Sequence, residues 1–283
     1  MNDFLNNWFA QIKISNAKKN MLLDRYIRIE TIWNTSINEL EGLSEEEIEK
    51  IKISKNIDLL IIESDLMRKN LIRTINIKDD IYPKKLRQIS GAPVVLYYKG
   101  NINLINEDSI GIIGTRYPTY YGKKTSNDIA RYLSNNAVVV ISGMALGIDM
   151  YAHIGAIKGS SKKTIAVLGN GLLEENIYPQ SNLELFKAIC ENGGLAISEY
   201  PIHTKASKEF FPARNRIIAA LSNKIIVVEA GMRSGTFITV DYALDYGKEV
   251  YAVPGGIYSE KSIGCNQLIK EGANPFCNIK DIL

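Results

Sequence analysis

The residues best suited to binding chemistry stand where short apolar runs of the sequence end. Glycine lets a backbone approach a ligand closely, and the unpaired N–H groups at helix N-termini attract anions. An arginine beside such a turn can hold a phosphate through two parallel hydrogen bonds. The sequence therefore predicts an anion-binding edge suited to phosphates. Its main junctions are Gly114-Thr115-Arg116, Ser142-Gly143 and Ser234-Gly235-Thr236.

A second candidate is residues 205–222, the most basic and aromatic segment of the chain. Its cations and aromatic residues are Lys205, Lys208, Phe210, Phe211, Arg214 and Arg216. Cations bind successive phosphates of a nucleic acid, and an aromatic ring stacks on any base, contributing roughly 1–3 kcal/mol. Pro212 should end an extended segment and place both arginines at a helix start, where cations oppose the helix dipole. This unfavourable placement points to an anionic ligand. The alternative is a charged surface loop above two core phenylalanines.

Other kinds of site find less support. The dinucleotide fingerprint and the phosphate loop of NTPases are both missing. Asp149 and His153 stand four residues apart, which we interpret as a helix-start residue and a packed histidine. Glu229 ends an apolar run, and we interpret it as a hydrogen-bonding residue. The cysteines are three in number and widely spaced, which fits neither a metal site nor a disulfide frame. We expect no catalytic residue, no cofactor and no metal.

The elements that must position these residues follow from the hydrophobic pattern. Apolar runs rich in β-branched residues span 109–114, 137–142, 164–169, 195–198, 224–230 and 249–255. Helix-length segments alternate with them near 122–134, 148–158, 181–192, 213–222, 236–246 and 264–271. Continuous apolar strands are buried on both faces, and the intervening helices form parallel crossovers. The pattern predicts a doubly wound, mostly parallel, Rossmann-like α/β sheet, whose strand ends gather at one carboxyl edge.

The front of the chain differs from the rest. Apolar residues recur at helical spacing in residues 3–14, 17–32 and 57–71, and Ser44 precedes three glutamates, as at a helix start. We expect a small all-helical N-terminal domain at 1–77 and a Rossmann-like domain at 78–283. The net charge of +3 is mild, so any nucleic-acid site must come from local clustering. With neither a signal peptide nor a run of roughly 20 apolar residues, we expect a cytoplasmic protein without membrane association.

Taken in order, the junctions resemble the DNA-processing protein A (DprA/Smf) family over residues 82–283. The matching stretches include IGIIGTR (110–116), SGMALGIDMYAH (142–153), FPARNRIIAALS (211–222), VVEAGMRSGTFITVDYAL (227–244) and GCNQLIKEGA (264–273). The resemblance implies a homodimer that binds single-stranded DNA in a basic pocket. It also implies loading of RecA recombinase in natural transformation or recombination, without enzymatic turnover. The helical front resembles the family's sterile-alpha-motif-like domain.

The family's pocket residues correspond here to Arg116, Lys208, Phe211, Arg214, Asn215 and Arg216. With the strand-end residues Gly143, Ser234, Gly235 and Thr236, they make up the predicted DNA-binding site. Leu146 and Gln180 depart from the family, because many relatives carry a basic residue at the first position and several carry a lysine at the second. The alternative function is a nucleotide-binding enzyme or sensor related to the phosphoribohydrolases of the lysine-decarboxylase-like group. Their glycine loop is distantly similar to residues 231–236.

Overall fold

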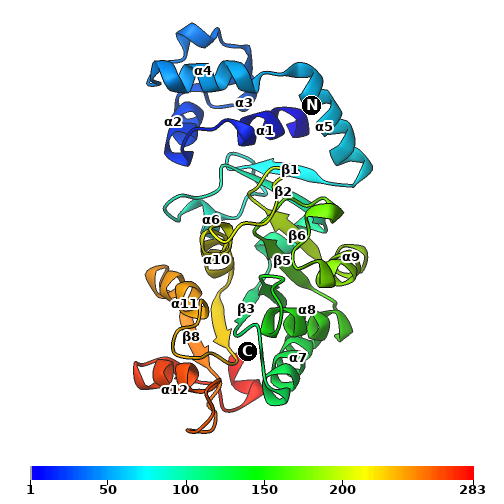
Figure 1. Ribbon diagram of the computed structural model, residues 1–283, viewed down its shortest axis with the longest axis vertical. Coiled ribbons are helices and arrows are strands. Elements are labelled where there is room, and N and C mark those ends of the chain that lie inside the picture. Colours follow the sequence, from blue (N-terminus) through cyan, green and yellow to red (C-terminus); the bar gives the residue numbers. More distant parts are fainter. Residues whose placement is uncertain (1) are drawn as a thin grey trace.

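The computed structural model describes residues 2–283, and its N-terminal part consists of five α-helices stacked at one end of the molecule (Figure 1). The helices are α1 (Asn2–Gln11), α2 (Asn16–Tyr26), α3 (Ile29–Asn34), α4 (Glu45–Ser54) and α5 (Ile57–Lys69). The α4 helix begins with a capping box, in which Ser44 and Glu47 each accept the other's backbone N–H. This confirms the helix start predicted at Ser44.

The chain then enters the sheet. Strand β1 (Arg73–Asn76) pairs antiparallel with β2 (Val95–Gly100), so the sheet reaches into the range 1–77, where the sequence predicts helices. The α1 helix packs against this pair. Trp8 and Phe9 on α1 are buried, and the hydroxyl of Tyr97 on β2 donates to Asn7 Oδ1 at 2.8 Å. The N-terminal helices and the sheet therefore share one hydrophobic cluster.

Nine strands form the sheet, in the order β1-β2-β6-β5-β4-β3-β7-β8-β9. The remaining strands are β3 (Ser109–Ile113), β4 (Val139–Ser142), β5 (Thr164–Leu168), β6 (Leu195–Ser198), β7 (Lys224–Val227), β8 (Glu249–Ala252) and β9 (Asn274–Pro275). The sheet is antiparallel at β1-β2-β6 and parallel from β6 to β9, which confirms the predicted mostly parallel α/β fold. Strands β3 and β7 are neighbours although far apart in sequence, so the strand order reverses between them.

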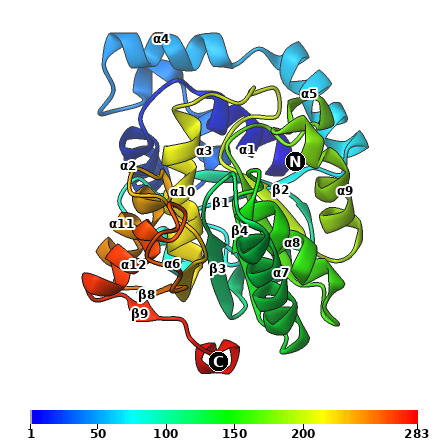
Figure 2. The ribbon, with the colours of Figure 1, turned by 60° about the horizontal axis from the view of Figure 1, so that its bottom comes forward.

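Helices cover both faces of the sheet (Figures 1 and 2). On one face lie α7 (Tyr120–Asn135), α8 (Ile148–Lys158) and α9 (Leu183–Glu191), and on the other α10 (Phe210–Leu221), α11 (Thr236–Asp245) and α12 (Ile263–Lys270). Alternate strand residues supply the two cores. Val140 on β4 packs in the cluster under α7 and α8, while Val139 and Ile141 join the cluster that contains α10.

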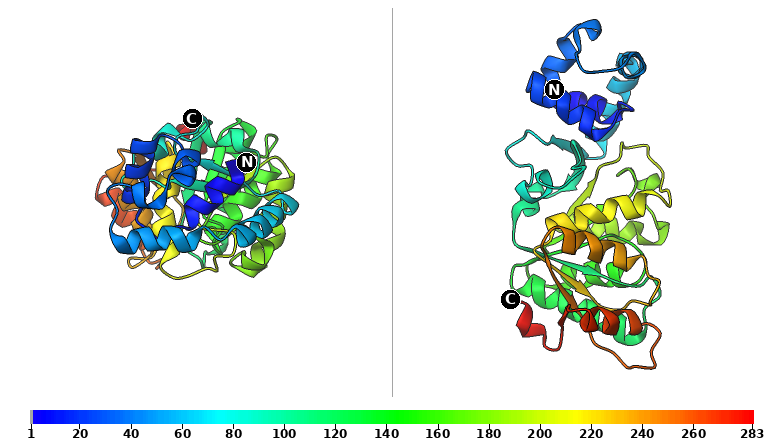
Figure 3. Two further views of the ribbon diagram at one scale, coloured as in Figure 1. Left: turned by 90° about the horizontal axis from the view of Figure 1, so that it is seen from above. Right: turned by 90° about the vertical axis from the view of Figure 1, so that its left-hand side faces the viewer.

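Short elements complete the chain: α6 (Lys84–Arg87) and the 3-10 helices at Ile37–Glu39, Ile102–Asn106, Glu174–Asn176, Gln180–Asn182 and Ile279–Ile282. The molecule is elongated, with the N-terminal helices at one end of its long axis (Figure 3). Across residues 2–283, no helix is both long and apolar enough to cross a lipid bilayer.

Candidate functional site

A cavity of about 530 Å³ opens where the strand order reverses, at the carboxyl ends of β3 and β7. Its wall combines the loop after β3, the start of α10 and the start of α11. Eight of the ten predicted binding residues line it: Arg116, Lys208, Phe211, Arg214, Asn215, Ser234, Gly235 and Thr236. In open α/β sheets, ligands bind in the crevice at this switch point. The arrangement brings two helix N-termini, several cations and an aromatic ring to one place.

Phe211 is the centre of an aromatic and cationic wall. The guanidinium carbon of Arg116 lies 5.5 Å from the centroid of its ring, and the ring of Tyr178 lies 5.6 Å away on a tilted plane. Tyr178 is not among the predicted site residues, although it follows the apolar run at 164–169, whose end the sequence predicts to lie at the same edge. The wall offers a flat surface for a base beside a charge for a phosphate.

Glu229 fixes the loop that carries Arg116. Its carboxylate, 2% exposed, accepts the backbone N–H of Thr119 at 2.9 Å and the hydroxyl of Thr119 at 2.5 Å. The Thr115 N–H donates to the Glu229 carbonyl at 2.8 Å. Gly122 allows this approach, because a Cβ there would lie 2.3 Å from the carboxylate. These bonds confirm the interpretation of Glu229 as a hydrogen-bonding residue.

Arg214 forms the floor of the cavity. Only 4% of the residue is exposed, and Nη1 donates to the carbonyl of Gly143 at 2.5 Å and to the carbonyl of Val167. Burial lowers the pKa of Arg214 to about 10, although the nearby Asp149 carboxylate opposes the shift. Gly143 is buried behind the guanidinium, where a Cβ would lie 2.5 Å from it. Arg214 thus joins the ends of β4 and β5 while keeping a positive charge under the cavity.

Asp149 and His153 are buried beside Arg214. The Asp149 carboxylate accepts the N–H groups of Gly143 at 3.1 Å and Ala145 at 3.4 Å. Burial raises the pKa of Asp149, and the positive charge of Arg214 opposes this shift. Nδ1 of His153 lies 2.8 Å from the hydroxyl of Thr164. Burial and the charge of Arg214 lower the pKa of His153 to about 3. The contacts confirm the interpretation of a helix-start aspartate and a packed histidine.

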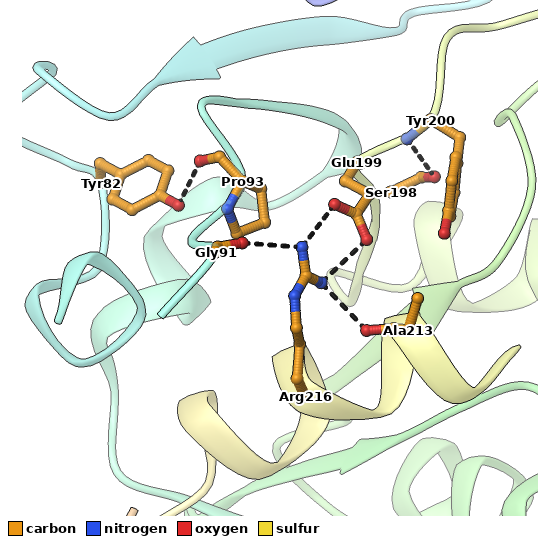
Figure 4. Close-up of polar contacts among 8 residues, drawn as sticks. All are labelled: Tyr82, Gly91, Pro93, Ser198, Glu199, Tyr200, Ala213 and Arg216. Carbon is orange, nitrogen blue, oxygen red and sulfur yellow. Dashed lines mark hydrogen bonds and ion pairs between the residues drawn. The ribbon is translucent and has the colours of Figure 1, made fainter. Parts of the chain in front are cut away.

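Arg216 does not line the cavity, and Figure 4 shows the protein groups that it contacts instead. Its guanidinium binds both carboxylate oxygens of Glu199, at 2.8 and 2.6 Å, and donates to the carbonyls of Ala213 and Gly91 at 3.0 Å each. The arginine therefore ties the start of α10 to the segment before β2. From the sequence, the place of Arg214 and Arg216 at a helix start points to an anionic ligand. In the structure, both guanidiniums bind groups of the protein itself, and these contacts explain their position. Glu199, which binds Arg216, directly follows β6, so its position at a strand end can be read from the sequence.

Comparison with known proteins shows the family to which the chain belongs. The family model for DNA recombination-mediator protein A matches residues 73–283. DprA of Streptococcus pneumoniae is 42% identical over 210 residues, which cover 74% of this chain and 73% of that protein. Its X-ray structure matches 98% of this chain and 96% of its own, with a TM-score of 0.84 and 32% identity.

A second solved structure, DprA of Helicobacter pylori, is described as having a unique single-stranded DNA binding mode. It matches with a TM-score of 0.67 and 33% identity over 74% of this chain and 93% of its own. The family match includes every residue that lines the cavity. This chain therefore belongs to the DprA/Smf family of DNA recombination-mediator proteins.

Proposed function

We propose that the cavity binds single-stranded DNA with little preference for base sequence. The observation that carries the proposal is the grouping of Arg116, Lys208 and Phe211 around one cavity at the switch point of the sheet. Cations that bind phosphates and a ring that stacks on any base are the two parts of sequence-independent single-strand binding. The single-stranded DNA binding described for the Helicobacter pylori relative supports the proposal.

Each part of the wall has a role in this proposal. Arg116 and Lys208 contact phosphates, assisted at the start of α11 by the backbone N–H of Gly235 and by the hydroxyls of Ser234 and Thr236, which lie 2.7 Å apart. Phe211 stacks on a base. Arg214 places its positive charge beneath the bound DNA. Its Nε donates to Oδ1 of Asn215 at 3.2 Å, which orients the Asn215 amide in the cavity wall.

Gly143 and Arg216 support the DNA site without contacting DNA. Gly143 makes room for the Arg214 guanidinium, and Arg216 anchors α10 through Glu199. Both residues keep the start of α10 in the position from which Phe211 and Asn215 reach the cavity.

In the cell, we propose that the protein acts as a homodimer in the cytoplasm and loads RecA onto single-stranded DNA during transformation or another recombination process, without turnover. Membership of the recombination-mediator family supports this role. It is tested by adding the protein to RecA and to DNA coated with single-strand-binding protein. Faster RecA-dependent strand exchange is expected, and an unchanged rate would remove the loading role.

The binding proposal is tested by titrating labelled oligo-dT with wild-type protein and with Arg116→Ala, Lys208→Ala and the control Lys69→Ala, an exposed lysine at the end of α5. Each phosphate contact contributes about 0.7 to the slope of log affinity against log salt for single strands. Each cavity variant should bind more weakly and lose about that much slope, while the control keeps both. Wild-type protein that binds no oligonucleotide at low salt would contradict the proposal, and free nucleotides would then be tested at Ser234–Thr236.

A further inference from the structure

Three tyrosines follow Arg116 within five residues, and all three hold their rings in solvent. Tyr117, Tyr120 and Tyr121 are 74%, 81% and 52% exposed. Tyrosine usually buries much of its ring, so three exposed neighbours need an explanation other than packing. Tyr117 lines the cavity, and Tyr120 and Tyr121 are the first two residues of α7. The exposed rings therefore continue outward from the cavity mouth over the start of this helix.

Positive charge accompanies the rings. Lys123 and Lys124 follow in the same helix, and Nζ of Lys123 lies 5.8 Å from the ring centroid of Tyr151 on α8. Lys124 forms an ion pair with Asp128 at 2.7 Å. In sequence, Arg116 thus precedes the three tyrosines and Lys123 follows them. Rings flanked by cations suit the bases and phosphates of a single strand.

The backbone beneath the rings is firmly held. Thr119, between Tyr117 and Tyr120, caps α7 by accepting the N–H of Gly122 at 3.2 Å. The buried Glu229 carboxylate binds both the backbone and the hydroxyl of the same threonine. The rings are thus presented on an ordered base, so little backbone entropy is lost when a ligand binds.

We infer that Tyr117, Tyr120 and Tyr121 form a stacking surface along which single-stranded DNA leaves the cavity over the start of α7. The inference rests on the proposed function of the cavity and extends it. The DNA site then holds more nucleotides than the cavity alone, and the outer ones are held by base stacking on phenol rings.

The inference is tested by comparing two oligo-dT lengths, about 4 and about 12 nucleotides, the range of typical single-strand site sizes. Tyr117→Ala, Tyr120→Ala and Tyr121→Ala are measured singly and combined, beside Tyr120→Phe. Tyr132→Ala is the control, because it removes a ring from the far end of the same helix. Thermal unfolding checks that each variant is folded.

We expect the combined alanine variant to bind the longer oligonucleotide at least about fivefold more weakly and the shorter one much less affected, because stacking on the outer bases is lost. Tyr120→Phe, which keeps the ring, should bind like wild type. Iodouracil placed in the outer half of the longer oligonucleotide should crosslink to these tyrosines.

Two results would overturn the inference in distinguishable ways. If wild type binds both lengths and the combined variant binds the longer one as tightly, the tyrosines do not carry DNA, although the cavity does. A surface for a protein partner would then be the alternative. If wild type binds neither length, the proposed function of the cavity fails as well.

Discussion

Replacing Arg214 with methionine removes a buried positive charge while leaving its partners in place. Methionine is apolar and of similar length, so much of the packing volume is kept. The carbonyls of Gly143 and Val167 lose their charged donor, and the Asp149 carboxylate loses the nearby cation that favours its ionised form. We expect Arg214→Met to fold with a markedly smaller free energy of unfolding.

The size of the loss follows from these contacts. Each buried acceptor left without a donor costs about 1–3 kcal/mol. Two carbonyls lose their donor, so we expect a loss of about 4 kcal/mol in all. For a protein of this size, that lowers the unfolding temperature by roughly 10 °C.

The aspartate supplies a rescue test. Asp149→Asn keeps an oxygen to accept the N–H groups of Gly143 and Ala145 but removes the charge. The double variant Arg214→Met with Asp149→Asn should therefore be more stable than Arg214→Met alone, because each charge influences the other in the folded protein.

The same loss should depend on pH. Because burial already raises the folded-state pKa of Asp149, the folded protein binds more protons than the unfolded chain between the two pKa values. Stability from this group falls as pH rises through that window. Without Arg214 the pKa rises further, so Arg214→Met should come closer to wild type as pH falls.

Differential scanning calorimetry of the single and double variants, at neutral and mildly acidic pH, measures all three expectations. Arg131→Met, an exposed arginine on α7, is the control for the substitution itself. An Arg214→Met protein that unfolds within about 2 °C of wild type would refute the role of the buried guanidinium. A double variant no more stable than the single one would refute the role of the Asp149 charge.

Two further predictions concern the layer beneath the cavity and its rim. The folded-state pKa of His153, about 3, lies below the ordinary value of 6.5, so between these pH values only the unfolded chain binds the proton. The free energy of unfolding therefore falls as pH drops below 6.5, by up to about 1.4 kcal/mol per pH unit. His153→Gln should flatten this slope in thermal unfolding, and parallel pH profiles would contradict it. Leu146, 36% exposed, follows the cavity residue Ala145, so Leu146→Lys should tighten oligo-dT binding and steepen the salt slope by about 0.7. An unchanged slope would show that position 146 lies beyond reach of the DNA.

Much of the fold follows from local patterns. The runs predicted at 109–114 and 164–169 became β3 and β5 with nearly the same bounds, and the helix expected at 148–158 is α8. Continuous β-branched runs and amphipathic segments are local signals, so they can be recognised without contacts from elsewhere. The cavity residues were predicted together for a topological reason, because parallel strands bring their carboxyl ends to one edge.

The remaining features depend on long-range contacts. Arg116 and Arg214 both look like cavity cations in the sequence, but only the meeting of β4 and β5 decides that Arg214 is buried between two carbonyls. The start of α10 was expected after Pro212 and lies at Phe210. Proline is tolerated in a first helical turn, where its missing N–H would have no partner. The short strand β1 is too brief to carry an alternating pattern.

The pairing of β1 with β2 has a consequence for the solution behaviour of the molecule. Without β1, strand β2 would be the end of the sheet, with a row of backbone N–H and C=O groups open to any other extended chain. A fragment that starts at residue 78 would have this open row and would also uncover the apolar surface beneath Trp8. Such a fragment invites strand-to-strand association into aggregates. With β1 present, β1 is the end strand, and its N–H groups at Thr74 and Asn76 donate to the carboxylates of Asp3 and Asp79 at 2.7 and 2.8 Å. The N-terminal segment therefore protects the solubility of the sheet.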